Sequence, residues 1–339
     1  MGKQKRTYII MGNGFSIGLI DKMGKSKQIN LKNLFCLGDK VKWPKSDEKG
    51  FLSRKHLVNL WTLGARPTMS DVEAAEFINE IITCMNVYNL MKTADTEELG
   101  MKEDENIYIN AYNELCTYLK NLFIYYNGLV TREEIESIAG EISVIQYIKK
   151  EINIGNEVIV VTYNYDIFLE RLLEAEKIPY IIEGINRASK VNKVRIIKPH
   201  GSISFSSKTP SVSKEYTIKS IFDSVSCDLK ELKLDYELHE DESIICALIP
   251  PSGDSGRVMG GWSKYYRDHI DKYMKESTER DNLIFYGLSY DHVDRMEMDN
   301  IITKVNPRIN VTYINPYPSR TMDAVLSSIF DNYAQLKEM

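Results

Sequence analysis

The chain has 339 residues, of which 43% are apolar and 27% are charged, and its formal net charge is −5. This length and composition are typical of a globular protein with one large domain, or with a core that carries a substantial insertion. Lys and Arg do not outnumber Asp and Glu, so the charge does not indicate binding to nucleic acid or to an anionic membrane.

Two further patterns concern location and cysteine chemistry. The chain has no apolar run long enough to span a membrane, and its N-terminal apolar run is too short for a signal peptide, so we expect a cytoplasmic protein. The cysteines are odd in number, far apart and without a CxxC pair, which argues against a disulfide framework and a structural zinc site. We predict no bound metal and reduced, mostly buried thiols at Cys36, Cys84, Cys116, Cys227 and Cys246.

A short apolar run that ends in glycines opens the chain. The sequence TYIIMGNGFSIGL (residues 7–19) predicts a strand, a tight turn and the start of a helix. Residues 21–55 are polar, rich in Lys and Gly, and show no clear period. They indicate a long irregular segment.

Three helices are predicted next, because apolar residues recur there at steps of three and four. A Thr131-x-x-Glu134 capping box opens the last of them. The predicted helices are residues 70–92, 106–126 and 131–151. We therefore assign residues 51–151 to a helical insertion that packs as a bundle, and residues 1–50 with 152–339 to the core.

After the insertion, apolar runs alternate with helix-like runs. Strands that are apolar throughout and separated by helices indicate a parallel sheet covered on both faces. We predict an α/β fold, a doubly wound, Rossmann-like parallel sheet with the helical insertion after its first strand. The predicted strands of this part are residues 158–163, 179–184, 194–201, 243–251, 283–290 and 311–316.

In such a fold the ligand lies beyond the carboxyl ends of the strands, where the connecting loops meet. The predicted strands end in short motifs with glycine or polar side chains, so we expect these loops to form the site. The motifs are GNGFS (12–16), TYNYD (162–166), KPHGS (198–202), IPPSG (249–253), YGLSY (286–290) and INP (314–316).

The first motif has two explanations. Gly12 and Gly14 let the backbone approach a pyrophosphate, with the amides of the next helix facing the anion, but a tight turn without a ligand explains them equally well. The GxGxxG fingerprint fails because Ile17 stands at the third glycine position. The expected acidic strand end about twenty positions later is also missing, so a hydride-transferring dehydrogenase is disfavoured.

The second and third motifs carry the strongest candidates for chemistry. Asn164 at a strand end can hold a water or a sugar hydroxyl through both a donor and an acceptor. Asp166 stands where a carboxylate either contributes to a site or only caps the next helix. A lone histidine is usually structural, but His200 follows a strand where the fold places its ligand, which favours a general base.

Together these motifs resemble the sirtuin-like superfamily. Its members carry GAG-x-S at the first turn, T-x-N-x-D at the second, H-G at the third, G-x-S after a later strand and an I-N pair near the end. The matching residues stand here in the same order, from residue 8 to about residue 320. They are Gly12-Asn13-Gly14-Phe15-Ser16, Thr162 to Asp166, His200-Gly201, Gly287-Leu288-Ser289 and Ile314-Asn315.

The chain departs from sirtuin deacylases in two places. Only Cys227 and Cys246 lie between His200 and Gly287, where the deacylases have a four-cysteine zinc ribbon, and no Pro-Asp-Phe-Arg segment follows Ser16. The acyl-peptide cleft is therefore in doubt. What remains looks like the bacterial sirtuin-like NADases of antiphage defence, which share the motif spellings and a helical insertion after the first strand.

This resemblance implies cleavage of the nicotinamide-ribose bond of NAD+ without a metal. Asn164 would be catalytic by positioning the ribose or the attacking water, and His200 would be the general base. The glycine turn would contact the pyrophosphate, and Asp166 would shape the nicotinamide end. The predicted NAD+-binding residues are Gly12, Asn13, Gly14, Phe15, Ser16, Asp166, Gly201, Gly287, Ser289 and Asn315.

Two other functions stay open: a non-catalytic sirtuin-like module that senses a nucleotide, and an NAD+-dependent protein deacylase. A constitutive NADase would kill its host, so the resemblance implies a trigger. We expect a homo-oligomer, or a separate activating partner of the ATPase, Argonaute or nucleotide-sensing type, and no direct nucleic-acid or membrane partner. We expect the helical insertion to cover the mouth of the site and to carry these protein contacts.

Overall fold

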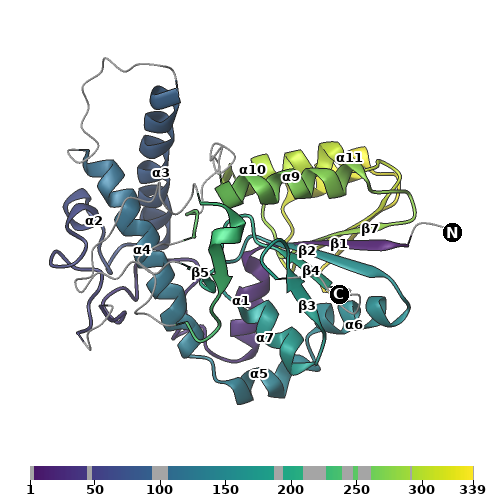
Figure 1. Ribbon diagram of the computed structural model, residues 1–339, viewed down its shortest axis with the longest axis horizontal. Helices are drawn as coiled ribbons and strands as arrows, with labels where there is room; N and C mark the ends of the chain where they lie inside the picture. The colour runs from purple at the N-terminus through teal and green to yellow at the C-terminus, as the bar shows by residue number, and fades with distance from the viewer. Residues whose placement is uncertain are drawn as a thin grey trace.

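The computed structural model describes residues 4–43, 48–93, 106–186, 194–208, 227–238, 247–250, 261–290 and 292–338. Its centre is a parallel sheet of seven strands in the order β3-β4-β2-β1-β7-β8-β9, with helices between the strands (Figure 1). The predicted α/β fold with a doubly wound parallel sheet is confirmed.

The strands form where the sequence is apolar throughout. β1 and β2 each bury five of their six residues and pair in parallel, with Ile9 opposite Val160. Strands covered on both faces favour such β-branched runs, because neither face is left for polar side chains. The sheet comprises β1 (Arg6–Met11), β2 (Glu157–Thr162), β3 (Tyr180–Ile182), β4 (Val194–Ile197), β7 (Asn282–Tyr286), β8 (Asn310–Ile314) and β9 (Tyr333–Leu336).

The structure differs from the predicted strands in two places. Residues 247–250, the described part of a predicted strand, join no sheet and form one isolated bridge, between Leu248 and Gly201. The edge strand β9 was not predicted, because its sequence YAQL is not an apolar run. The sequence also did not predict a separate antiparallel pair of strands, β5 (Phe205–Ser207) and β6 (Leu232–Leu234). The short 3-10 helix η2 (Leu229–Glu231) directly precedes β6.

Helices cover both faces of the sheet. In Figure 1, the C-terminal helices lie above it, and α1, α6 and α7 lie below it. The upper helices are α9 (Gly261–Lys275), α10 (His292–Lys304) and α11 (Arg320–Ile329), and the lower ones are α1 (Asn13–Lys22), α6 (Ser143–Asn153) and α7 (Phe168–Ala175). Among the described residues, no helix combines the length and the apolar character that crossing a bilayer requires.

A helical region separates β1 from β2 in the chain. α2 (Val58–Leu63), α3 (Asp71–Thr93) and α4 (Ile107–Gly128) lie together at one end of the molecule (Figure 1), and α2 and α3 both contact α4. Two of the three predicted helices are thus confirmed. The third predicted helix is divided into α5 (Arg132–Ala139) and α6, because the helical conformation ends at Gly140 and resumes at Ser143. The predicted capping box of Thr131 and Glu134 is present at the start of α5.

The order of the strands fixes where a site can form. From β1 the chain continues to β2, β3 and β4 on one side, and it returns to β7 on the other side of β1. The carboxyl ends of β1 and β7 therefore flank the topological switch point, where open α/β sheets bind ligands. The loops after β1, β2, β4 and β7 all lie at this edge.

Candidate functional site

Two glycine turns pack against each other at the switch point. The amide of Gly12 donates to the Tyr286 carbonyl (3.0 Å), and the amide of Gly14 donates to the Gly287 carbonyl (2.9 Å). A Cβ atom on Gly14 would lie 2.6 Å from that Gly287 oxygen, and one on Gly12 would lie 2.5 Å from the Leu288 side chain. This close approach by itself requires both glycines. The Gly14 amide, a predicted pyrophosphate contact, is already bonded within the protein.

A buried hydrogen-bonded cluster joins the loop after β2 to the first turn. The Asn164 amide nitrogen donates to the Gly12 carbonyl (3.1 Å) and to Ser16 Oγ (3.0 Å), and Ser16 Oγ donates to Asp166 Oδ2 (2.7 Å). The other carboxylate oxygen of Asp166 accepts from the Phe168 amide (3.1 Å), so Asp166 also binds the first amide of α7, whose N-cap residue is Ile167. Three predicted site residues are thereby held as one unit.

The cluster leaves one polar atom of Asn164 without a partner in the described part of the chain. Both N–H groups of the side chain are bonded, whereas no described residue donates to its oxygen Oδ1. That oxygen is therefore available to accept a hydrogen bond from water or from a ligand hydroxyl. Ser16 is fully buried and bonded at its hydroxyl. Its assignment to the pyrophosphate and ribose stays a prediction.

A buried ion pair lies directly beneath this cluster. Lys198 Nζ donates to Glu170 Oε1 (2.8 Å) and to the backbone carbonyl of Asp166 (2.7 Å), and both members of the pair are buried. Burial raises the pKa of the Asp166 carboxyl above its usual value, although Lys198 and the Ser16 hydroxyl oppose the shift. The same cause raises the pKa of Glu170. The ammonium group of Lys198 thus anchors the loop that carries Asn164.

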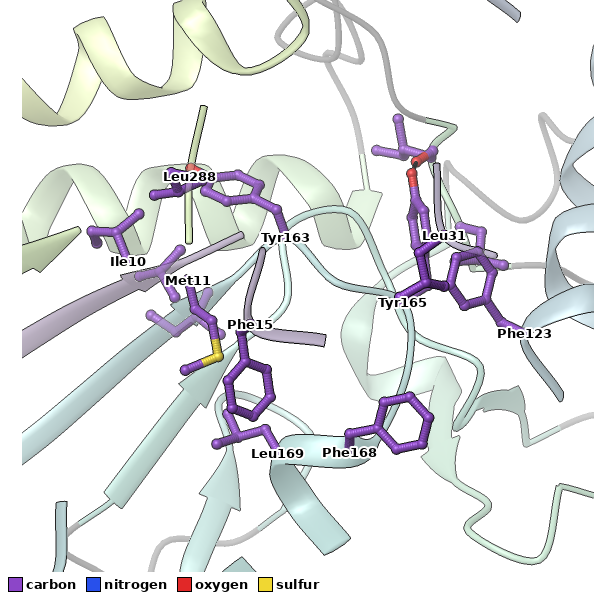
Figure 2. Close-up of a cluster of buried hydrophobic side chains, with 14 of the residues drawn as sticks. Ile10, Met11, Phe15, Leu31, Phe123, Tyr163, Tyr165, Phe168, Leu169 and Leu288 are labelled. Carbon is purple, nitrogen blue, oxygen red and sulfur yellow. Dashed lines mark hydrogen bonds between the residues drawn. The ribbon is translucent and has the colours of Figure 1, made fainter. Parts of the chain in front are cut away.

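The two tyrosines of the TYNYD loop diverge from Asn164. In Figure 2, the Tyr163 side chain extends toward Leu288, whereas Tyr165 extends toward Leu31 and Phe123. The Tyr165 ring contacts that of Phe123 edge to face (5.2 Å between centroids), and its hydroxyl donates to a backbone carbonyl of the 247–250 segment (2.6 Å). Tyr165 therefore joins helix α4 to the loops of the core.

His200 is held between a carboxylate and an aromatic ring. Its Nε2 lies 3.1 Å from Glu297 Oε1 of helix α10, and its ring meets the edge of Tyr163 at 4.8 Å between centroids. Both His200 and Glu297 are buried. The second oxygen of Glu297, Oε2, is buried and has no hydrogen-bond partner among the described residues. A base paired with an orienting carboxylate is the arrangement that activates histidine in many enzymes.

The exposure expected for the two catalytic candidates is wrong. Their positions at strand ends predict partly exposed side chains, but Asn164 is 7% exposed and His200 is 3% exposed. Asn164 is covered because its amide bridges two turns. His200 is covered because the 247–250 segment runs beside it, with the Ile249 amide donating to the His200 carbonyl (3.0 Å).

Gly201 is required by this neighbouring segment. It has a φ of +86°, and a Cβ atom there would lie 1.8 Å from the Ala247 carbonyl oxygen. Only glycine fits such a conformation at such a distance. Gly201 therefore shapes the loop of His200, whereas residues 251–253 of the IPPSG motif lie outside the described residues.

A cavity of about 300 Å³ opens beside His200. Tyr163 and His200 line one side, and helices α9 and α10 line the other with Arg267, Asp271 and Glu297 among their polar groups. Asp271 is bonded by Lys304 and Asn300 of α10, so it ties the two helices together. Sequence reasoning missed these residues of α9 and α10, because they carry no motif and lie among many other charged residues of the two helices.

The remaining predicted NAD+-binding residues lie outside the cluster of Ser16, Asn164 and Asp166. Asn13 is exposed and donates to the Leu31 carbonyl (3.1 Å), whereas Phe15 is packed in the core beside α7 (Figure 2). Ser289 is exposed after β7. Asn315 donates to the Leu288 carbonyl (2.8 Å) and so fixes the YGLSY loop. Their contacts with a dinucleotide stay predictions.

Cys227 and Cys246 are the cysteines that bear on the predicted absence of a zinc site. Burial raises the pKa of the Cys227 thiol to about 11, so in the absence of a metal it is protonated at neutral pH. Cys246 lies outside the described residues. Within the described ranges, no three His, Cys, Asp or Glu side chains are grouped so as to hold a metal ion.

A family comparison agrees with this arrangement of loops. Residues 158–314 match the model of the SIR2-like domain, a segment that runs from β2 to the end of β8 and includes Asn164, His200 and Glu297. The glycine turn after β1 and the helical region precede the matched residues. A comparison with curated proteins gives no match. Residues 158–314 therefore form a SIR2-like domain, the kind of domain that uses NAD+.

Proposed function

We propose that the protein is an NAD+ glycohydrolase that cleaves the nicotinamide-ribose bond, and that it acts as an NAD+-depleting effector of bacterial antiphage defence. One observation carries the activity: His200 is paired with Glu297 in the wall of a cavity, next to the loop that holds Asn164. The SIR2-like domain supports NAD+ as the substrate. The defence role is supported by the resemblance of the motifs and the helical insertion.

In this proposal, two side chains handle the attacking water. The C–N bond between ribose and nicotinamide breaks, its electron pair leaves with nicotinamide, and water forms the new bond to the anomeric carbon. His200 accepts the proton that this water loses. Asn164 Oδ1 accepts a hydrogen bond from the water or from a ribose hydroxyl, since both of its N–H groups are already bonded.

The size and charge of the cavity suit the nicotinamide half of the substrate. Its volume of about 300 Å³ is at the lower end for small-molecule sites, which fits one half of a dinucleotide. The lining has three carboxylates, Asp268, Asp271 and Glu297, against one guanidinium, Arg267. Asp268 and Asp271 are each paired with a lysine, so Glu297 is the carboxylate that would favour the cationic nicotinamide ring and the oxocarbenium-like state that follows.

Two other functions remain testable against this one. A nucleotide-sensing module would bind NAD+ without cleaving it, and a deacylase would release nicotinamide only with an acylated peptide. The pairing of His200 with a carboxylate favours catalysis over sensing, because binding alone needs no oriented base. An activating partner or a homo-oligomer is part of the proposal, because unregulated NAD+ depletion would harm the host.

The test is to incubate the purified protein with NAD+ and to measure free nicotinamide, with and without an acetylated peptide. Release without peptide supports the glycohydrolase, release only with peptide indicates a deacylase, and binding without release indicates a sensor. Asn164→Ala and His200→Ala should each lower the rate by about 10²–10⁴. Thermal unfolding of each variant checks that the fold is kept, and full activity in either one removes that residue from the mechanism.

A further inference from the structure

We propose that Glu297 is the positioning residue for His200. The kinetic test of this inference rests on the proposed hydrolysis of NAD+. The two side chains come from separate elements, the loop after β4 and helix α10, and lie 97 positions apart. The Nε2–Oε1 distance of 3.1 Å is within hydrogen-bond range. Tyr163 contacts the ring edge to face, so the imidazole has a carboxylate at one nitrogen and an aromatic ring at its side.

This contact decides which imidazole nitrogen is the base. A carboxylate is an acceptor, so it favours the tautomer that carries its hydrogen on Nε2. The lone pair then belongs to Nδ1, which becomes the atom that takes the proton from water. When the proton arrives, the imidazolium is positive, and the Glu297 carboxylate 3.1 Å away stabilises that charge.

Glu297 also differs from a carboxylate that serves only to hold helices together. Its oxygen Oε2 is buried and lacks a hydrogen-bond partner among the described residues. An unsatisfied buried acceptor of this kind is unfavourable for stability. Because Glu297 lines the cavity, this oxygen is placed to accept a hydrogen bond from a ligand or from a water that the ligand retains.

The other two carboxylates of the cavity are engaged elsewhere. Asp271 of α9 is engaged by Lys304 and Asn300 of α10, and Asp268 is engaged by Lys264 one helical turn away. Arg267 donates to a serine hydroxyl of its own helix (3.0 Å), and its positive charge also interacts with the Glu297 carboxylate. Among the described residues, Glu297 is therefore the carboxylate that contacts His200.

The kinetic test compares two substitutions of Glu297. Glu297→Gln keeps an acceptor without the charge, and Glu297→Leu removes both. We expect kcat to fall on the order of 10²-fold or more in the leucine variant and by less in the glutamine variant. KM should change by less than about threefold in both, because the role is in the chemical step. Unchanged kcat in Glu297→Leu overturns the proposal.

A matched control tests whether the loss of kcat depends on the contact with His200 or would follow from changing any buried glutamate. Glu151 of helix α6 is likewise buried and accepts hydrogen bonds from Thr7 (2.7 Å) and Asn156 (2.8 Å), but it lies at the opposite, amino end of the strands. Glu151→Gln should leave kcat unchanged, even where it lowers the melting temperature. An equal loss of kcat in Glu151→Gln would show that any buried glutamate has this effect, and the proposal would fail.

A second measurement needs no activity. Nitrogen-15 NMR of labelled histidine reports which ring nitrogen carries the hydrogen, and the signal of His200 is assigned by its loss in His200→Gln. We expect the Nε2–H tautomer in the native chain and in Glu297→Gln, and a loss of that preference in Glu297→Leu. The same tautomer in all three proteins overturns the proposal. If the native chain releases no nicotinamide, the proposed function fails, and this measurement alone decides the role of Glu297.

Discussion

Ser16 Oγ donates a hydrogen bond of 2.7 Å to Asp166 Oδ2 across 150 positions of the chain. The bond joins the first turn of α1, which follows β1, to the loop after β2. β1 and β2 are neighbouring strands of the sheet, but the helical region separates them in the sequence. The loop that carries Asn164 is thus complete only when these two strands have paired. Folding of the sheet and assembly of the candidate site are therefore coupled.

The buried carboxyl of Asp166 gives the fold a defined response to pH. Burial raises its pKa in the folded state, so the folded protein binds this proton more strongly than the unfolded chain does. The stabilising contribution is fully present below the unfolded pKa, near 4, and is lost as the pH rises through the higher folded pKa. Relative to Asp166→Asn, which does not titrate, the native chain should lose unfolding free energy over this range.

Urea unfolding of both proteins at several pH values measures the effect. The variant also loses a carboxylate acceptor for Ser16, which lowers its stability by a constant amount at every pH. Only the slope of the difference therefore tests the raised pKa. A native chain that gains stability relative to Asp166→Asn as the pH rises from 4 would contradict it.

The ion pair beneath the loop should be costly to break from one side. Lys198 and Glu170 are 0% and 1% exposed at their side chains, so Lys198→Met leaves a buried carboxylate without its counter-charge. We expect a loss of about 3–5 kcal/mol in the free energy of unfolding. The double variant Lys198→Met, Glu170→Gln should recover part of it, because it removes the charge that was left unpaired.

A surface pair supplies the comparison. Lys149 and Glu176 lie 2.6 Å apart, but the lysine side chain is 43% exposed. Lys149→Met should cost at most about 1 kcal/mol. Equal losses for Lys198→Met and Lys149→Met would mean that the depth of the buried pair has no energetic consequence.

The glycine turns predict opposite effects for one substitution at two nearby positions. Gly14→Ala places a Cβ 2.6 Å from the Gly287 carbonyl and should destabilise the protein by about 1–3 kcal/mol. Gly18 lies in the same helix with no atom within 4 Å of the added Cβ, so Gly18→Ala should raise stability by about 0.5–1 kcal/mol. Melting temperatures of the two variants should move in opposite directions.

The sequence predicted the sheet well because its strands are buried on both faces and are therefore apolar throughout. The same logic missed β9, an edge strand with alternating polar residues, and it placed a strand at residues 243–251, whose described part lies beside His200 outside the sheet. Motif order indicated which loops meet. It could not reveal Glu297, because a glutamate in an acidic helix carries no signal until the fold brings it to His200.

Lys198 shows a signal that could have been used. It ends the apolar run VRII, and a lysine there must either reach solvent or find a buried counter-charge. The structure shows the second outcome, with Glu170 as the partner. The glycine turn is a case in which the sequence signal had a structural explanation. The GNG sequence suggested a phosphate-binding turn, whereas packing against Gly287 already requires a glycine at position 14.

Chelation should leave the protein unchanged. The thiol of Cys227 has a raised pKa, and the sequence offers no four-cysteine cluster in the segment where sirtuin deacylases carry zinc. EDTA should therefore alter neither the melting temperature nor the release of nicotinamide. A drop in either quantity that added Zn²⁺ restores would show that the chain holds a structural metal.

The last prediction contrasts two neighbours in the TYNYD loop. Asn164→Asp replaces the amide that donates to the Gly12 carbonyl and to Ser16 with a carboxylate, which cannot donate when ionised. The new charge would also lie beside Asp166, which shares Ser16 with it. We expect this nearly isosteric change to abolish NAD+ cleavage and to lower stability.

Tyr165→Phe should behave differently, because its side chain extends away from Asn164. The change removes the hydrogen bond from the hydroxyl to the Ile249 carbonyl (2.6 Å) and keeps the ring contact with Phe123. A loss of about 1 kcal/mol in stability is expected, with most of the NAD+ cleavage retained at saturating NAD+. If Tyr165→Phe were as damaging to kcat as Asn164→Asp, the phenol would take part in the chemistry, and the roles assigned within this loop would have to be exchanged.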